Sequence, residues 1–320
     1  MISTRFVGLA ITGLLLPALA LSGCITGGST GEAETTRADF GARCHAPAVI
    51  RCFGFDTPEE VAPYIFAVPG TARHPEIDAT TQASGTGSLR FTIPPRSGAN
   101  TSGLFMVNVS DDLTRQFGQG EELYIQWRQR FSPELLETPF EGGLGWKQLI
   151  LGEGDRAGFN APGCTQLELV VSNSNQYGFP QMYHSCGGKD GQFESLFQKS
   201  TVRYKPNQWM TFQLHVKIGT WYKNDYRYSG DSTVQLSIAE EGAPPTQVID
   251  LSPESARLFG LPIPGTSTGY DLANSNPAAK YGKILLTPYH TGKSETQDHP
   301  TAYLWYDELI VSTAKIPDPS

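Results

Sequence analysis

Basic residues are scarce in this sequence of 320 residues, which has 24 Lys and Arg against 32 Asp and Glu, and only 18% of the residues are charged. The acidic balance argues against a general nucleic-acid-binding protein, because such proteins need an excess of positive charge. The low charge, together with 11% aromatic residues, argues against a disordered chain. No internal repeat is visible, which disfavours a propeller or a solenoid.

Several motifs of known chemistry are also missing. The sequence contains no Cys-x-x-Cys pair, no glycine loop of the kind that cradles phosphates, no dinucleotide-binding fingerprint and no Ser-His-Asp order. No nucleotide cofactor and no serine nucleophile are therefore predicted.

The longest apolar run lies at the N-terminus. Arg5 is followed by an apolar stretch from Phe6 to Leu21, and this stretch ends in Leu21-Ser22-Gly23-Cys24. A run this short with a basic start is typical of a secretory signal rather than of a membrane-spanning helix. Leu-Ser-Gly-Cys resembles the lipobox of bacterial lipoproteins, which implies that residues 1–23 are removed and that Cys24 is acylated.

Residues 24–42 are predicted to form a flexible tether, because the residues after Cys24 are small and polar and show no apolar periodicity. Residues 43–320 are predicted to form a single domain. The resemblance to lipoproteins implies an exported protein that its lipid alone anchors to the bacterial cell envelope, at the outer membrane or the cell surface. A plain secreted protein with an incidental cysteine is the alternative.

Four cysteines remain once Cys24 is assigned to the anchor: Cys44, Cys52, Cys164 and Cys186. An even number in an exported chain indicates disulfides, for which three connectivities exist. We favour Cys44–Cys52 and Cys164–Cys186, because the members of each pair are close in sequence. A zinc site is the rival interpretation, but His45 is the only histidine nearby.

Strands are predicted along most of the chain, since 34 Gly, 23 Pro, 13 Tyr and 16 Phe favour short strands joined by turns. The predicted strands are 88–93, 103–109, 122–131, 145–151, 167–172, 181–184, 209–218, 232–238, 247–250, 283–287 and 302–311. Short helices are predicted at 57–62, 111–117 and 252–259, each after a capping residue. This pattern predicts an all-β protein, a two-sheet antiparallel jelly-roll sandwich with a few short helices in its loops.

The alternation within strands assigns side chains to faces. In 124–131, Ile125, Trp127 and Phe131 fall on the core face, and the polar and basic residues fall on the other face. A local positive stripe that could accept an anionic glycan is predicted from Arg128, Arg130, Lys147, His215 and Lys217.

Six segments carry a family resemblance: 84–91, 124–132, 145–149, 208–217, 286–292 and 303–312. In this order they resemble the concanavalin A-like jelly-roll superfamily, and within it the sandwich-fold polysaccharide lyases of the glucuronan and alginate lyase type. The resemblance implies cleavage of an acidic glycan by β-elimination, although the superfamily also contains glycoside hydrolases and lectin-like domains. The Gln-Ile-His and Tyr-Phe-Lys-Ala-Gly pieces of alginate lyases are not found here. The resemblance also implies a structural Ca²⁺, with Asp56 and Asp307 as its candidate ligands, and the alternative role of these two acids is that of capping or surface residues.

β-Elimination on a uronate polymer needs a group that neutralises the carboxylate, a base at C5 and an acid at the leaving oxygen, and it needs no cofactor. Histidine or tyrosine suits the last two roles, and the candidates are the pairs Tyr183-His184 and Tyr289-His290, of which one member each should reach the groove. The candidates for substrate binding are Gln126, Arg128, Arg130, Lys147 and Gln148, with Trp221 as a stacking platform for sugar rings.

Two other functions remain open. The first is a non-catalytic carbohydrate-binding lipoprotein, for which the exposed aromatic residues argue. The second is a glycoside hydrolase, although the acids that jelly-roll hydrolases present as Glu-x-Asp-x-x-Glu are absent. In each case the expected partner is a polysaccharide. The protein itself is expected to be a monomer that binds no nucleic acid.

Overall fold

The structure is a computed structural model that describes residues 29–142, 145–154, 166–172, 180–185, 203–221, 231–254, 272, 278 and 280–320. The predicted signal peptide, Cys24, Cys164 and Cys186 lie outside these residues, so the assignments made for them stay predictions. None of the described helices is long and apolar enough to cross a membrane.

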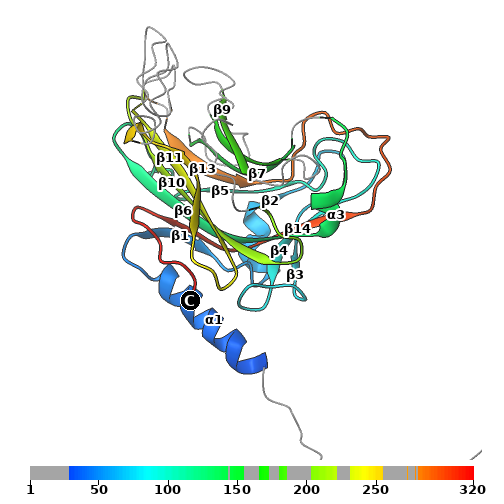
Figure 1. Cartoon of the computed structure of the whole chain (residues 1–320), viewed down its shortest axis with the longest axis horizontal. Coiled ribbons are helices and arrows are strands. Elements are labelled where there is room, and N and C mark those ends of the chain that lie inside the picture. The colour runs from blue at the N-terminus through cyan, green and yellow to red at the C-terminus, as the bar shows by residue number, and fades with distance from the viewer. Residues whose placement is uncertain are drawn as a thin grey trace, which may run out of the picture.

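Two antiparallel sheets form the layers of the molecule (Figure 1). Sheet A has eight strands in the order β12 (Thr246–Leu251), β11 (Thr233–Glu240), β10 (Trp209–Lys217), β6 (Glu122–Phe131), β14 (Ala302–Ser312), β4 (Ser88–Ile93) and β3 (Glu76–Asp78), with β1 (Val49–Phe53) also paired to β14. Sheet B has six strands in the order β2 (Ile65–Phe66), β5 (Leu104–Asn108), β13 (Tyr281–Leu286), β7 (Gly145–Glu153), β8 (Gln166–Ser172) and β9 (Pro180–Ser185). The predicted two-sheet sandwich is confirmed, and every predicted strand is present.

The core lies between the two sheets and is built by strand alternation. Ile125, Trp127 and Phe131 are fully buried, as the sequence predicts. The Trp127 ring stacks on Phe212 of the neighbouring strand β10, with 5.2 Å between the ring centroids. Because the opposite positions of each strand point away from this core, each sheet also has an outer face.

Short helices occupy the loops, and their capping residues explain where they begin. α2 (Pro58–Val61) begins after Thr57, whose side chain accepts a hydrogen bond from the Glu60 N–H, so the helix predicted at 57–62 is confirmed. It continues into the 3₁₀ helix η1 (Ala62–Tyr64). α3 (Pro133–Glu137) follows the same Ser/Thr-Pro-Glu pattern after Ser132, but the sequence interpretation missed it.

The helix predicted at 111–117 is wrong, because this segment forms turns. The Asp112 side chain accepts hydrogen bonds from the Thr114 N–H and hydroxyl, and the Ser110 hydroxyl accepts one from the Arg115 N–H. These local bonds compete with helical ones. Most of the third predicted helix, 252–259, lies outside the described residues.

The N-terminal segment differs most from its prediction. Residues 29–42, for which the sequence predicts a tether, belong to helix α1 (Ser29–Cys44), which packs beside sheet A near the C-terminus (Figure 1). The Cys44–Cys52 disulfide, which is confirmed, ties the end of α1 to β1 with 5.8 Å between the Cα atoms. The buried Arg43 guanidinium donates to Gln126 at 2.7 Å and to Glu308 at 2.5 Å. The end of α1 therefore covers part of the outer face of sheet A.

Candidate functional site

Three residues predicted to bind substrate lie on the outer face of sheet A, where other parts of the chain hold them. Gln126 is buried, because its amide bonds to Arg43 and to the Pro317 carbonyl. Arg128 forms an ion pair with Glu241 at 2.8 Å, and the Arg130 guanidinium lies 5.9 Å from the centre of the Trp305 ring. These contacts stabilise the fold. The three residues lie on the opposite side of the molecule from Lys147.

Two further candidates for substrate binding lie in the core, which corrects their predicted placement. Gln148 donates to Gln129 at 2.6 Å and accepts from the Tyr204 hydroxyl at 2.8 Å, both between the sheets. A bulge between Lys147 and Leu149 turns its side chain inward. Trp221 is also buried, with its ring centroid 5.0 Å from that of Tyr281, so neither side chain reaches a surface where a sugar could bind.

The first Tyr-His pair is divided between the two faces of sheet B. His184 is buried on the core side, with its Nε2 atom 2.7 Å from the Tyr281 hydroxyl. Met182 is buried in the core as well, so position 183 between them belongs to the outer face of the sheet. The side chain of Tyr183 lies outside the described part of the structure.

The second pair, Tyr289-His290, is divided in the same way. Tyr289 is 37% exposed, whereas His290 is fully buried. The His290 ring packs 4.8 Å from Trp146 and 6.0 Å from Phe140, measured between ring centroids. Burial, the largest cause, lowers the pKa of His290 to about 4, so this histidine is neutral at pH 7 and does not face solvent.

The outer face of sheet B brings together the candidates that remain. Lys147 lies between Trp146 and Gln148, which both point inward, and it is partly exposed. The backbone N–H of Lys147 donates a hydrogen bond to the backbone carbonyl of Tyr289 at 2.7 Å, so the two residues are neighbours. Along the sheet, Lys147 pairs with Val170 of β8, and Val170 pairs with Gln181 of β9. Position 183, two residues beyond Gln181, therefore shares the face of Lys147.

An apolar patch borders this face and was not predicted. Met106, Ile150 and Leu285, from β5, β7 and β13, form a cluster separate from the main core, with Phe66 and Leu104 packed against it. Their neighbours in each strand point into the core, which places the cluster on the outer face of sheet B. The patch could have been predicted from the apolar residues on both faces of these strands, a pattern that is typical of strands covered on both sides.

The two acids predicted to bind Ca²⁺ both hold the loop at residues 83–86. The Asp307 carboxylate accepts hydrogen bonds from the N–H groups of Ala83, at 2.7 Å, and Ser84. Asp56 accepts from the Thr86 N–H and hydroxyl, and a side chain at Gly85, where φ is +66°, would collide with it.

These N–H donors occupy lone pairs that a cation would need, and burial raises the pKa of Asp307 well above its usual range. The arrangement is that of two turn anchors rather than of a Ca²⁺ site. Among the described residues, no group of three or more His, Cys, Asp or Glu could hold a metal ion. The Ca²⁺ assignment stays a prediction that these contacts do not favour.

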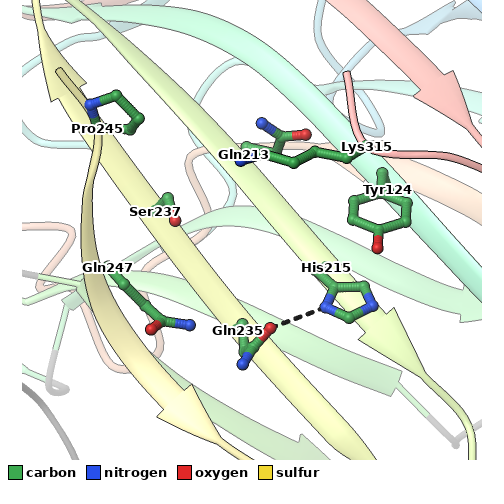
Figure 2. Close-up of a pocket in the computed structure, with 8 residues that line it drawn as sticks. All are labelled: Tyr124, Gln213, His215, Gln235, Ser237, Pro245, Gln247 and Lys315. Carbon is green, nitrogen blue, oxygen red and sulfur yellow. Dashed lines mark hydrogen bonds between the residues drawn. The ribbon is translucent and has the colours of Figure 1, made fainter. Parts of the chain in front are cut away.

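A polar pocket of about 380 Å³ lies on the outer face of sheet A (Figure 2). Side chains from β6, β10, β11 and β12 line it, and Lys315 reaches it from the segment after β14. His215, which lines the pocket, forms hydrogen bonds with Gln235 and Glu122, each at 2.9 Å. The sequence places His215 on the positive stripe, but a pocket needs the packing of β12 and the C-terminal segment, which no local pattern predicts.

The buried His290 leads to a stability prediction. The unfolded chain exposes this imidazole, whose ordinary pKa is 6.5, and therefore binds a proton between pH 6.5 and 4, where the folded protein does not. The free energy of unfolding should fall by about 3 kcal/mol as the pH falls through this range. We expect the free energy of unfolding of His290→Phe, measured by urea unfolding at a series of pH values, to lose most of this pH dependence. The exposed His74→Phe control should keep it, and an unchanged dependence in His290→Phe would contradict the assignment.

No protein-family model matches the sequence, and no curated protein matches it either. Among solved structures, a marine PL-14 alginate lyase from Aplysia kurodai is similar with a TM-score of 0.54 and 12% identity, over 84% of this chain and 99% of that one. The endo-beta-1,4-glucuronan lyase of the fungus Trichoderma reesei has a TM-score of 0.46 and 12% identity, over 83% and 96%. The alginate lyase Aly36B has 0.45 and 14%, over 86% and 95%. The chain thus has the sandwich fold seen in the Aplysia kurodai structure.

Proposed function

We propose that the protein is a polysaccharide lyase that cleaves an acidic, uronate-containing glycan by β-elimination on the outer face of sheet B. The observation that carries the proposal is the backbone hydrogen bond between Lys147 and Tyr289, which makes neighbours of a partly exposed lysine and an exposed tyrosine. The shared fold with a structure described as an alginate lyase supports the same reaction class. Export and acylation of Cys24 stay predictions, and the Cys44–Cys52 disulfide is typical of an oxidising compartment.

The reaction assigns a role to each group. Lys147 pairs with the uronate carboxylate and stabilises the negative charge that develops when the C5 proton leaves. Tyr289 or Tyr183, as a phenolate, accepts that proton. The electron pair of the C5–H bond forms the C4–C5 double bond, the C4–O bond breaks, and the leaving oxygen takes up the proton that the tyrosine removed from C5. The products are a new non-reducing end with a double bond and a new reducing end.

His184 and His290 have no part in this proton transfer, because both are buried on the core side. Each ring instead packs against a residue of the sheet. His290 contacts Trp146, the residue before Lys147, and His184 lies beside position 183 in β9. In the proposal, the two histidines support the strands that carry the reactive groups.

A panel of polymers tests the proposal. The full chain without its signal peptide is incubated with alginate, polyglucuronate and a neutral glucan, and both ultraviolet absorbance and reducing ends are followed. We expect the conjugated double bond to absorb with at least one uronate polymer and not with the neutral glucan. Reducing ends without this absorbance would identify a hydrolase. Retardation in a polymer-containing gel without either signal would identify a binding protein, and both results would overturn the lyase.

A further inference from the structure

The pocket on the outer face of sheet A lies on the far side of the core from Lys147. In β10 and β11, Leu214 and Leu236 point into the core, and Gln213, His215 and Gln235 alternate with them on the outer face. The volume of about 380 Å³ is within the range of sites that hold a small ligand or one to two sugar units. A ligand bound here cannot reach the face proposed for elimination.

The floor of the pocket is fixed by hydrogen bonds. The Gln213 amide bonds to both the carbonyl and the N–H of Ile316, at 3.1 and 2.9 Å. The Gln235 amide lies between His215 and Asp250, with its donor bond to Asp250 at 3.0 Å. Side chains held in this way lose little conformational freedom when a ligand binds, which favours affinity.

The aromatic wall is equally well held. The rings of Tyr124 and His215 stack with their centroids 4.4 Å apart, and Glu122 accepts a 2.6 Å hydrogen bond from the Tyr124 hydroxyl. Burial, followed by this bond, raises the pKa of Tyr124 to about 12, so the ring stays neutral at physiological pH. Tyr124 and Pro245, which line the pocket at different ends (Figure 2), offer the apolar surface that the C–H groups of a pyranose need.

The remaining lining groups are available to a ligand. Within the part of the chain that the structure describes, the side chains of Ser237, Gln247 and Lys315 form no hydrogen bond or ion pair. They offer a hydroxyl, an amide and an ammonium. The acids next to the lining, Glu122 and Asp250, already bind His215 and Gln235.

Lys315 therefore gives the open part of the pocket a positive charge. A single cation is too few for nucleic acid, and the polar floor does not suit a lipid chain. Hydroxyl and amide groups with one ammonium match a sugar that carries a carboxylate.

We propose that this pocket is a second glycan-binding site, which takes a uronate residue with its carboxylate on Lys315 and its hydroxyls on Ser237 and Gln247. The choice of a uronate rests on the function proposed above, while the pocket itself does not. Two sites on opposite sheets would let one molecule hold a polymer at the pocket while another segment of the same polymer is cleaved on sheet B. This raises the effective concentration of substrate at the outer face of sheet B.

Affinity gel electrophoresis tests this site in the Lys147→Ala background, so that the polymer in the gel stays intact. We expect polyglucuronate or alginate to retard the protein, and Gln247→Ala/Lys315→Ala to weaken the apparent affinity by about tenfold or more. Lys205→Ala removes a partly exposed lysine that does not line the pocket and lies 3.6 Å from Glu240, and it should leave the retardation unchanged. Added salt should weaken binding to the parent and have less effect on the double variant.

The outcomes separate this site from the lyase activity. Equal retardation of the parent and the double variant, or none at all, would overturn the second site whether or not the wild type cleaves. Retardation by neutral hydroxyethyl cellulose that the double variant also loses would overturn the uronate assignment. Loss of binding in the double variant of a protein that cleaves nothing would support the site and refute the lyase.

Discussion

Lys147→Ala should lower the rate of formation of unsaturated ends by about 100-fold or more, without a matching loss of stability. Removing one group that stabilises charge in a transition state costs on the order of 10²–10³ in rate. Lys147 is the lysine that β7 presents on the outer face of sheet B, next to Tyr289. The measurement is the initial rate at which ultraviolet absorbance increases with the polymer that the wild type cleaves best.

The control is Lys280→Ala, an exposed lysine directly before β13 of the same sheet. This variant should keep the wild-type rate, which would show that the effect of Lys147→Ala is not a general loss of positive charge. Tyr289→Phe separates the two tyrosines, because a large loss of rate assigns the proton transfer to Tyr289 and a small one leaves it to Tyr183. Wild-type activity in Lys147→Ala, with melting temperatures equal, would refute the proposed site.

Arg43→Met should destabilise the folded protein by about 3–5 kcal/mol, because it leaves the carboxylate of Glu308 buried without its partner. The two side chains are 4% and 1% exposed and lie 2.5 Å apart. Arg43 also bonds to Asp39 and Gln126, so the variant loses the contacts that join α1 to β6 and β14. Methionine keeps most of the volume of the arginine stem, which limits the loss of packing.

Urea unfolding of single and double variants measures this effect. Arg43→Met/Glu308→Gln removes both charges and should recover much of the stability lost in Arg43→Met. Arg96→Met breaks an ion pair with Asp298 in which both side chains are 68% exposed, and should change stability by less than about 1 kcal/mol. An Arg43→Met variant as stable as the wild type would show that α1 does not depend on this pair.

The fold was predictable because strand alternation is a strong local signal. Ile125, Trp127 and Phe131 fall on one face of a single strand, and burial in the core requires that spacing. Helix α1 was missed because its packing depends on Arg43, whose partners Gln126 and Glu308 are distant in sequence. The pattern Ser132-Pro133-Glu134 could have predicted α3, since Thr57-Pro58-Glu59 correctly predicted α2.

The site was only partly predictable, because a sequence lists polar residues without saying which face they reach. Tyr289 is exposed and His290 is buried, although the two are adjacent. One bulge in β7 sends Gln148 into the core while Lys147 stays outside. Gln126 has the alternation of a surface residue, but Arg43 and the C-terminal segment cover it. These outcomes depend on contacts between distant segments.

The masses of the cleavage products test the proposed reaction most directly. A uronate oligosaccharide of defined length is treated with the full chain lacking its signal peptide, and the fragments are measured by mass spectrometry. Elimination divides the starting mass between two fragments, because it adds no water, and the fragment with the new non-reducing end carries a double bond. A pair of fragments whose masses exceed the starting mass by one water would contradict the lyase and identify a hydrolase.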